Sequence, residues 1–119
     1  MRGSSEAHSR LVDDVHLAVG GLPFVRIWKN ATGAARSFDD PDRVISFGLK
    51  GSSDLIGILL GGKIICLECK TGNASQSKEQ ENFEAMIKKF GGYYFVVRST
   101  EEALKIVTET ARAMQACPK

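Results

Sequence analysis

Apolar residues recur at helical spacing near the start of the chain, which predicts an amphipathic helix. Ser5 precedes an acidic residue and is the expected N-cap, and Gly20-Gly21 marks the end of the helix. Ordered structure is therefore expected from about Ser5. The inward-facing positions are Leu11, Val15, Ala18 and Val19.

Two further helices are predicted in the second half of the chain. Ser77 is a suitable N-cap for the first, which would end at Gly91-Gly92, and Ser99 or Thr100 would begin the second. Their apolar residues follow a period of about 3.6, which places one stripe of each helix against a core. The inward-facing residues are Phe83, Met86, Ile87 and Phe90 in one helix, and Leu104, Val107, Ala111 and Met114 in the other.

Short apolar runs predict four β-strands. Residues 24–28 and 93–98 form two of them, and residues 54–60 and 63–70 form a hairpin across Gly61-Gly62. The hairpin strands are almost wholly apolar, so we expect them to be buried on both faces. Between residues 30 and 50 no period holds, and glycine, proline and aspartate residues indicate a long loop that is functional or mobile.

The predicted elements follow the order αβββαβα. A helix between the third and fourth strands predicts a right-handed crossover, which adds the fourth strand to a mixed sheet. We therefore expect an α/β fold with a central mixed sheet flanked by helices. At 119 residues the chain suffices for one core, so residues 5–119 are expected to form a single domain. Residues 1–4 resemble an expression-vector remnant and are expected to be disordered or tag-derived.

Composition narrows the class of protein without identifying its partner. The 43% hydrophobic and 25% charged residues are typical of a globular protein, and no apolar run approaches the ~18 residues that cross a membrane. A net charge of +2 is too small to indicate a polyanionic partner by itself. Three cysteines without a secretory signal favour an intracellular, cytoplasmic protein over a secreted one.

Two patterns that often mark metal or catalytic sites are not interpreted in that way here. Cys66 and Cys69 are three residues apart on a predicted strand, so they would point to opposite faces and would not chelate one zinc ion. His8 and His16 lie two turns apart on the first predicted helix. They are interpreted as surface histidines.

Charged residues stand at the ends of the two central strands. Asp54 opens one strand, and Glu68 and Lys70 close the next. Because side chains alternate along a strand, Glu68 and Lys70 share a face. Two carboxylates beside an ammonium group suit Mg²⁺ or Mn²⁺ and the hydrolysis of a phosphodiester, with Lys70 orienting the attacking water. From spacing alone, a buried Glu68–Lys70 ion pair without further function is an equal alternative.

The register of the hairpin decides whether the carboxylates meet. A strict two-residue turn at Gly61-Gly62 would place Asp54 opposite Cys69 and on the other face from Glu68. A connection of three or five residues, or a bulge with a left-handed glycine, would place Asp54 opposite Glu68. We predict the second arrangement, because a shared metal site requires it.

The segment Gly51-Ser52-Ser53-Asp54, followed after thirteen residues by Glu68-Cys69-Lys70, resembles the motif of the PD-(D/E)XK nuclease superfamily. The downstream Ser77-Lys78-Glu79-Gln80 makes the chain similar to the VRR-NUC family, including its stand-alone, single-domain members. The resemblance extends from about Glu6 to Glu102. It implies a restriction-endonuclease-like αβββαβα fold and a Mg²⁺- or Mn²⁺-dependent DNA endonuclease, often specific for branched or junction DNA.

The resemblance also implies roles for individual residues. Its catalytic set here is Asp54, Glu68, Lys70 and Gln80. The metal would be held by Asp54, Glu68 and the backbone carbonyl of Cys69, and completed by Glu6 of the first helix, with Asp13 and Asp14 as alternatives to Glu6. Ser77 and Gln80 also have the spacing of a capping box, a structural role that is compatible with a place at the site.

A possible DNA-binding surface comes from cations in and around the long loop. Trp28 and Phe38 interleave them, as is common where a chain follows a nucleic-acid backbone. Three aspartates interrupt the run, so we expect a mobile loop that orders on DNA rather than a preformed basic patch. The cations are Arg26, Lys29, Arg36, Arg43 and Lys50.

Three further expectations concern alternatives and assembly. The alternatives to a nuclease are a catalytically silent DNA-binding module and a subunit that acts only through protein contacts. One site cuts one strand, so a two-fold homodimer is expected to supply paired cuts. The apolar surfaces considered for its interface are the exposed part of Trp28 and the helix from Thr100 to Ala116, with Leu104, Val107 and Met114.

Overall fold

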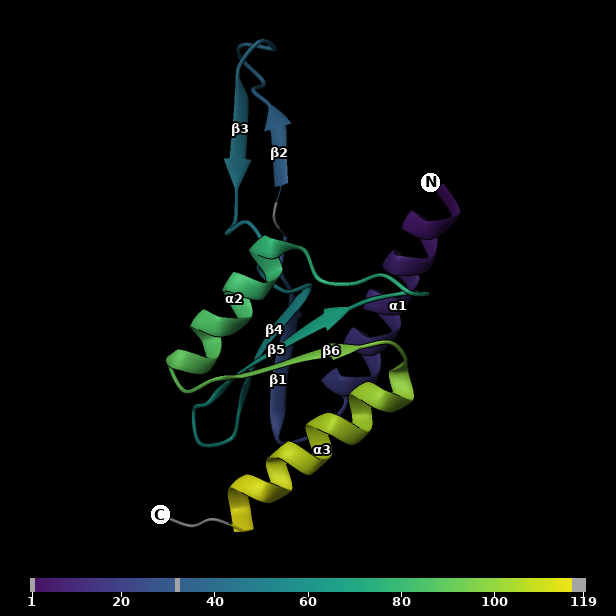
Figure 1. Ribbon diagram of the computed structural model, residues 1–119, viewed down its shortest axis with the longest axis vertical. Coiled ribbons are helices and arrows are strands. Elements are labelled where there is room, and N and C mark those ends of the chain that lie inside the picture. Colours follow the sequence, from purple (N-terminus) through teal and green to yellow (C-terminus); the bar gives the residue numbers. More distant parts are fainter. Residues whose placement is uncertain (1, 32, 117–119) are drawn as a thin grey trace.

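The computed structural model describes residues 2–31 and 33–116 (Figure 1). In chain order its elements are α1 (Arg2–Gly20), β1 (Val25–Lys29), β2 (Gly33–Arg36), β3 (Val44–Phe47), β4 (Leu55–Leu59), β5 (Ile64–Cys69), α2 (Lys78–Lys89), β6 (Tyr93–Val97) and α3 (Thr100–Ala116).

The central sheet has four strands in the order β1-β4-β5-β6. Strand β4 pairs antiparallel with both β1 and β5, whereas β6 pairs parallel with β5. Helix α2 connects the parallel pair, because parallel neighbours need a crossover rather than a tight turn. The predicted mixed α/β sheet flanked by helices is therefore confirmed.

Two groups of buried residues hold the layers together. Helices α1 and α3 pack on one face of the sheet and bury Val15, Val19 and Val107 against Leu55 and Leu67. Helix α2 packs on the other face. There the buried cluster is Cys66, Phe83, Ile87 and Tyr94.

Helix α2 leaves part of its face of the sheet open. Every residue of β5 from Ile65 to Cys69 is buried, but Ile58 of β4 is 43% exposed. The prediction that both hairpin strands are buried on both faces is thus right for β5 and wrong for β4. The reason is that the single helix α2 contacts β6 and the middle of β5, so the α2-side face of β1 and β4 lacks a helical cover.

Residues 33–47 form a second, two-stranded antiparallel sheet that projects beyond the rest of the molecule (Figure 1). We call this β2–β3 hairpin the arm. The prediction of a long loop between residues 30 and 50 is wrong here. Adjacent residues Val44 and Ile45 of β3 are 59% and 44% exposed, so these described positions lack the alternation of burial by which a strand is identified.

The helix ends differ in part from the predicted ones. Helix α1 begins at Arg2, before the predicted cap Ser5, whereas Met1 lies outside the described residues. Helix α2 is capped by Ser77 as predicted. Phe90, predicted to face inward, is its C-cap and is 79% exposed, because the helix ends before the stripe completes another turn.

Helix α3 uses its apolar stripe within the domain. Val107 is fully buried, and Leu104 and Met114 pack against the same core as α1. The domain's own core takes up Val107 fully and Leu104 and Met114 in part, which leaves little of this stripe for the dimer interface that the sequence suggested. Trp28, the other surface considered, is 46% exposed.

Candidate active site

The β4–β5 connection sets the geometry of the site. The N–H of Leu59 donates to the carbonyl of Lys63 at 2.9 Å, so three residues, Leu60 to Gly62, form the connection. Gly61 and Gly62 both have positive φ angles, of 100° and 96°, which glycine adopts without strain. The prediction of a three-residue connection with left-handed glycine is confirmed.

The resulting register brings the two carboxylates together. Leu55 pairs with Leu67 and Ile58 with Ile64, so the same register continued by one residue places Asp54 opposite Glu68. Cross-strand partners share a face of the sheet. Asp54 and Glu68 are therefore neighbours at the end of the sheet, as a shared site requires.

Glu68 is a buried acid with an incomplete set of partners. Glu68 is 3% exposed, and its Oε1 atom has no hydrogen-bond partner among the described residues. Burial raises the pKa of Glu68 to about 8, with a further contribution from the charge of Asp54, although Lys70 acts in the opposite direction. The site thus holds an acceptor that is costly to leave unpaired.

Gln80 connects Glu68 to Lys70. Its Nε2 donates to Glu68 Oε2 at 2.9 Å, and its Oε1 accepts from Lys70 Nζ at 2.7 Å. Lys70 Nζ itself lies 3.6 Å from Glu68 Oε2, and the Lys70 side chain is 13% exposed. The amide therefore holds the ammonium group in a fixed position beside the carboxylate.

The same Gln80 completes the cap of α2. Its backbone N–H donates to Ser77 Oγ, and its Oε1 accepts from the backbone N–H of Ser77 at 2.9 Å. The predicted capping box is confirmed, and the same residue also lies beside Glu68 and Lys70. The start of α2 is thereby tied to the end of β5.

Asp54 is held by two groups. The backbone N–H of Cys69 donates to Asp54 Oδ2 at 2.8 Å, and His8 Nε2 lies 3.2 Å from the same oxygen. His8 lies at the surface as predicted, with 40% of its side chain exposed, but its contact with Asp54 was not predicted. His8 stands one turn before Val12 on the helix stripe that continues through Val15, and that stripe faces the sheet.

The segment before Asp54 is anchored by residues that sequence reasoning missed. Asn30 Nδ2 donates to Ser52 Oγ at 2.7 Å and to the carbonyl of Ser53 at 2.9 Å. Gly51 has a φ of 87°, and a Cβ there would lie 2.5 Å from the carbonyl oxygen of Glu79. The glycine of the Gly-x-x-Asp motif is therefore needed for both its backbone conformation and the close approach of α2.

Of the acidic residues considered on the first helix, Asp13 lines the same hollow as Asp54, whereas Glu6 does not. Glu6 is exposed, and Asp13 forms an ion pair with Lys29. His8 occupies the place beside Asp54 that Glu6 was expected to fill. Across residues 2–31 and 33–116, no group of three or more His, Cys, Asp or Glu side chains has the arrangement to hold a metal ion.

The two central cysteines point to opposite faces, as predicted. Cys69 belongs to the core beneath α1 and α3, and Cys66 to the core beneath α2. Both are buried free thiols, and burial raises the pKa of Cys69 to about 12. They are therefore core residues with low reactivity. Cys117 lies outside the described residues.

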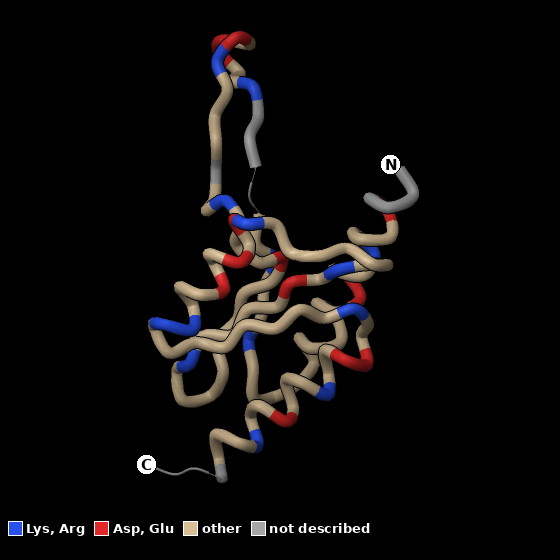
Figure 2. The backbone as a smooth tube through the Cα atoms, viewed as in Figure 1, with Lys and Arg blue, Asp and Glu red and all other residues tan. Residues whose placement is uncertain are grey.

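The predicted DNA-binding cations do not form one patch. Lys29 pairs with Asp13 and Lys50 with Glu79, while Arg36 donates to a backbone carbonyl within the arm. Arg26 and Arg43 are exposed. At the end of the arm, acidic and basic residues lie together, so the arm carries no concentrated positive charge (Figure 2).

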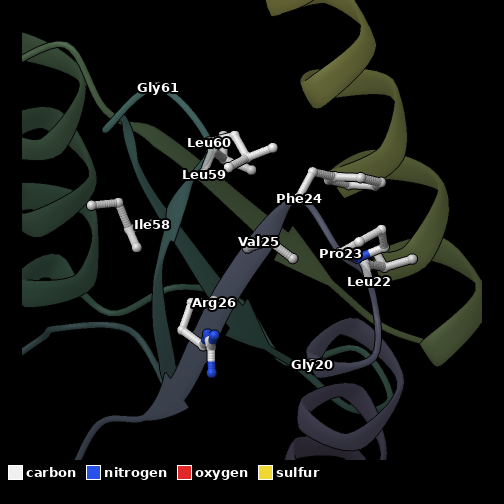
Figure 3. A pocket seen from close by; sticks show the side chains of 10 residues that line it. All are labelled: Gly20, Leu22, Pro23, Phe24, Val25, Arg26, Ile58, Leu59, Leu60 and Gly61. Atoms are coloured by element: carbon white, nitrogen blue, oxygen red, sulfur yellow. The ribbon is translucent and has the colours of Figure 1, made fainter.

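Two hollows lie at opposite ends of the central strands. The larger, of about 540 Å³, lies beside Phe24, Arg26 and Leu60, at the end away from the carboxylates (Figure 3). The other, of about 390 Å³, opens between α1 and β1 and is lined by His8 and Asp54 among other residues. The second hollow exposes Asp54 of the candidate site from the α1 side.

Comparison of the chain with known protein families found no match, and comparison with curated proteins found none either. No helix within the described residues is both long and apolar enough to cross a membrane. Function is therefore inferred from the geometry around Asp54, Glu68 and Lys70.

Proposed function

We propose that this chain is a Mg²⁺- or Mn²⁺-dependent DNA endonuclease with a restriction-endonuclease-like fold, as its resemblance to the VRR-NUC family implies. Without the arm, the element order α1, β1, β4, β5, α2, β6, α3 matches the expected αβββαβα. The observation that carries the proposal is the register that sets Asp54 opposite Glu68, with Lys70 fixed beside them.

The alternative of a buried ion pair without function explains this arrangement less well. A self-sufficient pair would satisfy Glu68, yet Oε1 is left without a partner in the described part of the chain, and the nearby Asp54 disfavours ionisation of Glu68. Repulsion between two carboxylates costs stability unless a cation lies between them. A divalent cation would offset that cost.

The donor set fits such a cation. Asp54 and Glu68 would hold it, with the carbonyl of Cys69 that the resemblance adds, and water would complete the coordination, since Mg²⁺ keeps several waters and needs only one or two carboxylates. When bound, the ion lowers the pKa of a water ligand and offsets negative charge on the phosphoryl group.

The chain's own residues position the reactants. In hydrolysis the attacking water gives a proton to solvent as its oxygen bonds to phosphorus, and the departing sugar oxygen takes a proton from solvent as its bond to phosphorus breaks. Lys70 donates hydrogen bonds to the attacking water or to a phosphoryl oxygen, and Gln80 keeps the ammonium group in place. His8 and the Cys69 N–H orient the Asp54 carboxylate, so they are positioning residues.

The proposal extends to substrate, assembly and location. Branched or junction DNA is the proposed substrate class, and a two-fold homodimer is the proposed way to make paired cuts. Buried free thiols at Cys66 and Cys69 are compatible with a reducing, intracellular compartment. The exposed part of Trp28 is the remaining surface considered for contact between subunits.

The decisive experiment incubates purified protein with labelled duplex, flap and junction DNA in Mg²⁺, Mn²⁺, Ca²⁺ or EDTA. Cleavage is expected in Mg²⁺ or Mn²⁺, none in EDTA, and none by Glu68→Gln. Glu109→Gln is the matched control, because Glu109 is an exposed acid on α3. Binding of DNA without cleavage in any metal would contradict the proposal and favour a catalytically silent module.

A further inference from the structure

An exposed tryptophan lies on the open part of the sheet. Trp28 of β1 is 46% exposed, and its cross-strand partner Ile56 lies at the edge of the core beneath α2. The next pair on the same face of these strands is Arg26 with Ile58, and Ile58 is 43% exposed. Arg26 and Ile58 lie on the other side of the strands from Val25 (Figure 3).

The register places this tryptophan beside the carboxylates. The N–H of Asn30 donates to the carbonyl of Asp54 at 2.8 Å, which continues the β1–β4 pairing by one residue. Because alternate residues share a face, Trp28 projects on the same side as Asn30 and Asp54. Diagonal neighbours of this kind have Cα atoms about 7–8 Å apart, a span that one unstacked nucleotide can bridge.

The chemistry of this surface suits a nucleobase. An exposed indole on a sheet offers a flat face on which an unpaired base can stack, and such stacking tolerates any base sequence. Arg26 lies two residues back on the same face, where its guanidinium group can pair with a phosphate. This cation favours a polyanionic strand over a second apolar protein surface.

We propose that Trp28 stacks against an unpaired base of the DNA strand whose phosphodiester lies at Asp54 and Glu68. The inference rests on the proposed nuclease function and narrows its substrate to DNA with a single-stranded segment next to the cut, such as a flap or a gap. Fully paired duplex would not offer a base to Trp28, so it binds more weakly.

Trp28 is the only tryptophan in the sequence, so its fluorescence reports on this surface alone. The first experiment titrates the protein with flapped, single-stranded or fully paired DNA in Ca²⁺, with gels to verify that the DNA stays intact. Flapped and single-stranded DNA are expected to quench the fluorescence, and paired duplex to quench it much less. Equal quenching by all three, or none, would overturn the inference.

The second experiment measures affinity by anisotropy of labelled flapped DNA. Trp28→Ala is expected to weaken binding about 5- to 150-fold, whereas Trp28→Phe retains most of it. Phe90→Ala is the matched control, because Phe90 is an exposed aromatic residue at the C-cap of α2. Thermal melting of each variant checks the fold.

The outcomes separate this inference from the nuclease proposal. If Trp28→Ala binds and cleaves flapped DNA as the unmodified protein does, stacking is refuted while the nuclease proposal stands. If the protein neither binds nor cleaves DNA, the stacking inference and the nuclease proposal are both refuted. If Trp28→Ala instead converts a dimer to a monomer in sedimentation equilibrium without changing affinity per subunit, the surface is an interface between copies and stacking is overturned.

Discussion

The carboxylate end of the central sheet and the arm both carry charged residues, but they hold them differently. Glu68 is 3% exposed and accepts a hydrogen bond from Gln80, whereas Asp39 and Asp40 at the end of the arm are exposed. Burial and strand register fix the site before any ligand arrives. The arm is a two-stranded sheet, which is only marginally stable alone. Substitutions should therefore change chemistry at the site and only affinity on the arm.

The sharpest contrast is between two aspartates. Asp54→Asn is expected to reduce the cleavage rate by about 1,000-fold or more, because it removes charge from the proposed metal site while preserving shape. Asp39→Asn, on the exposed end of the arm, should leave the rate within about twofold. Single-turnover cleavage with saturating DNA measures both. Similar losses of cleavage rate in the two variants would contradict the predicted difference between the site and the arm.

A substitution at Lys70 should separate the effect on catalysis from the effect on metal binding. Lys70→Ala is expected to lower the rate by about 100-fold or more while divalent cations still bind, since the ammonium group acts on the reactants. Gln80→Ala should cause a smaller loss, because Lys70 would keep its charge but lose the 2.7 Å hydrogen bond that positions it. Isothermal titration with Mn²⁺ provides the metal readout. Loss of Mn²⁺ binding in Lys70→Ala would show that the lysine organises the metal site instead.

The buried acid makes stability depend on pH. The pKa of Glu68 is raised from its usual value near 4.5 to about 8, so between these pH values the folded state binds more protons than the unfolded state. Without divalent cations, stability should therefore fall as pH rises through this window.

Glu68→Gln tests this dependence because it removes the charge. The variant should be more stable than the unmodified protein at pH 8 in EDTA, by about 1–3 kcal/mol, and the difference should shrink toward pH 5. Glu109→Gln, an exposed change on α3, should alter stability by less than about 0.5 kcal/mol. Urea unfolding at both pH values measures the effect. A Glu68→Gln variant that is less stable at pH 8 would contradict the assigned pKa direction.

The smallest effects are expected on the arm. Replacing Arg36 and Arg43 together by alanine should weaken DNA binding several-fold. The slope of log affinity against log salt concentration should fall by about one phosphate contact per arginine. Folding stability should change by less than about 0.5 kcal/mol, because Arg43 is exposed and Arg36 donates only within the arm. Anisotropy titrations across a salt series test this. An unchanged salt slope would remove the arm from the DNA-binding surface.

The sequence predicted most of the central sheet because its strands are apolar and bounded by glycines. The same reasoning predicted that Asp54 and Glu68 face one another, since only one register permits it. It did not detect the arm, where the described side chains of β3 at Val44 and Ile45 are exposed and show no alternation of burial. A strand without a core leaves little trace in hydrophobic periodicity.

The helix contribution to the site was harder to predict. An acidic residue was sought near the start of α1, whereas the structure brings His8 to Asp54. The apolar stripe of Val15 and Val12, extended by one turn, reaches His8. The helical period of the sequence therefore already indicated that His8 lies on the same face of the helix as that stripe. What the sequence alone did not supply was the position of that stripe relative to the sheet, which depends on tertiary packing.

The contact between Gly51 and α2 has a consequence for local unfolding. Gly51 approaches the carbonyl of Glu79 so closely that no side chain fits between them. The loop that carries Asp54 and the helical turn that carries Gln80 therefore cannot separate without losing their mutual packing. They should open in one cooperative event, and their amide protons should exchange with solvent at a common rate. A fluctuation that releases the carboxylate would release the lysine's partner at the same time, so the site would pass between assembled and disassembled forms without a half-assembled one.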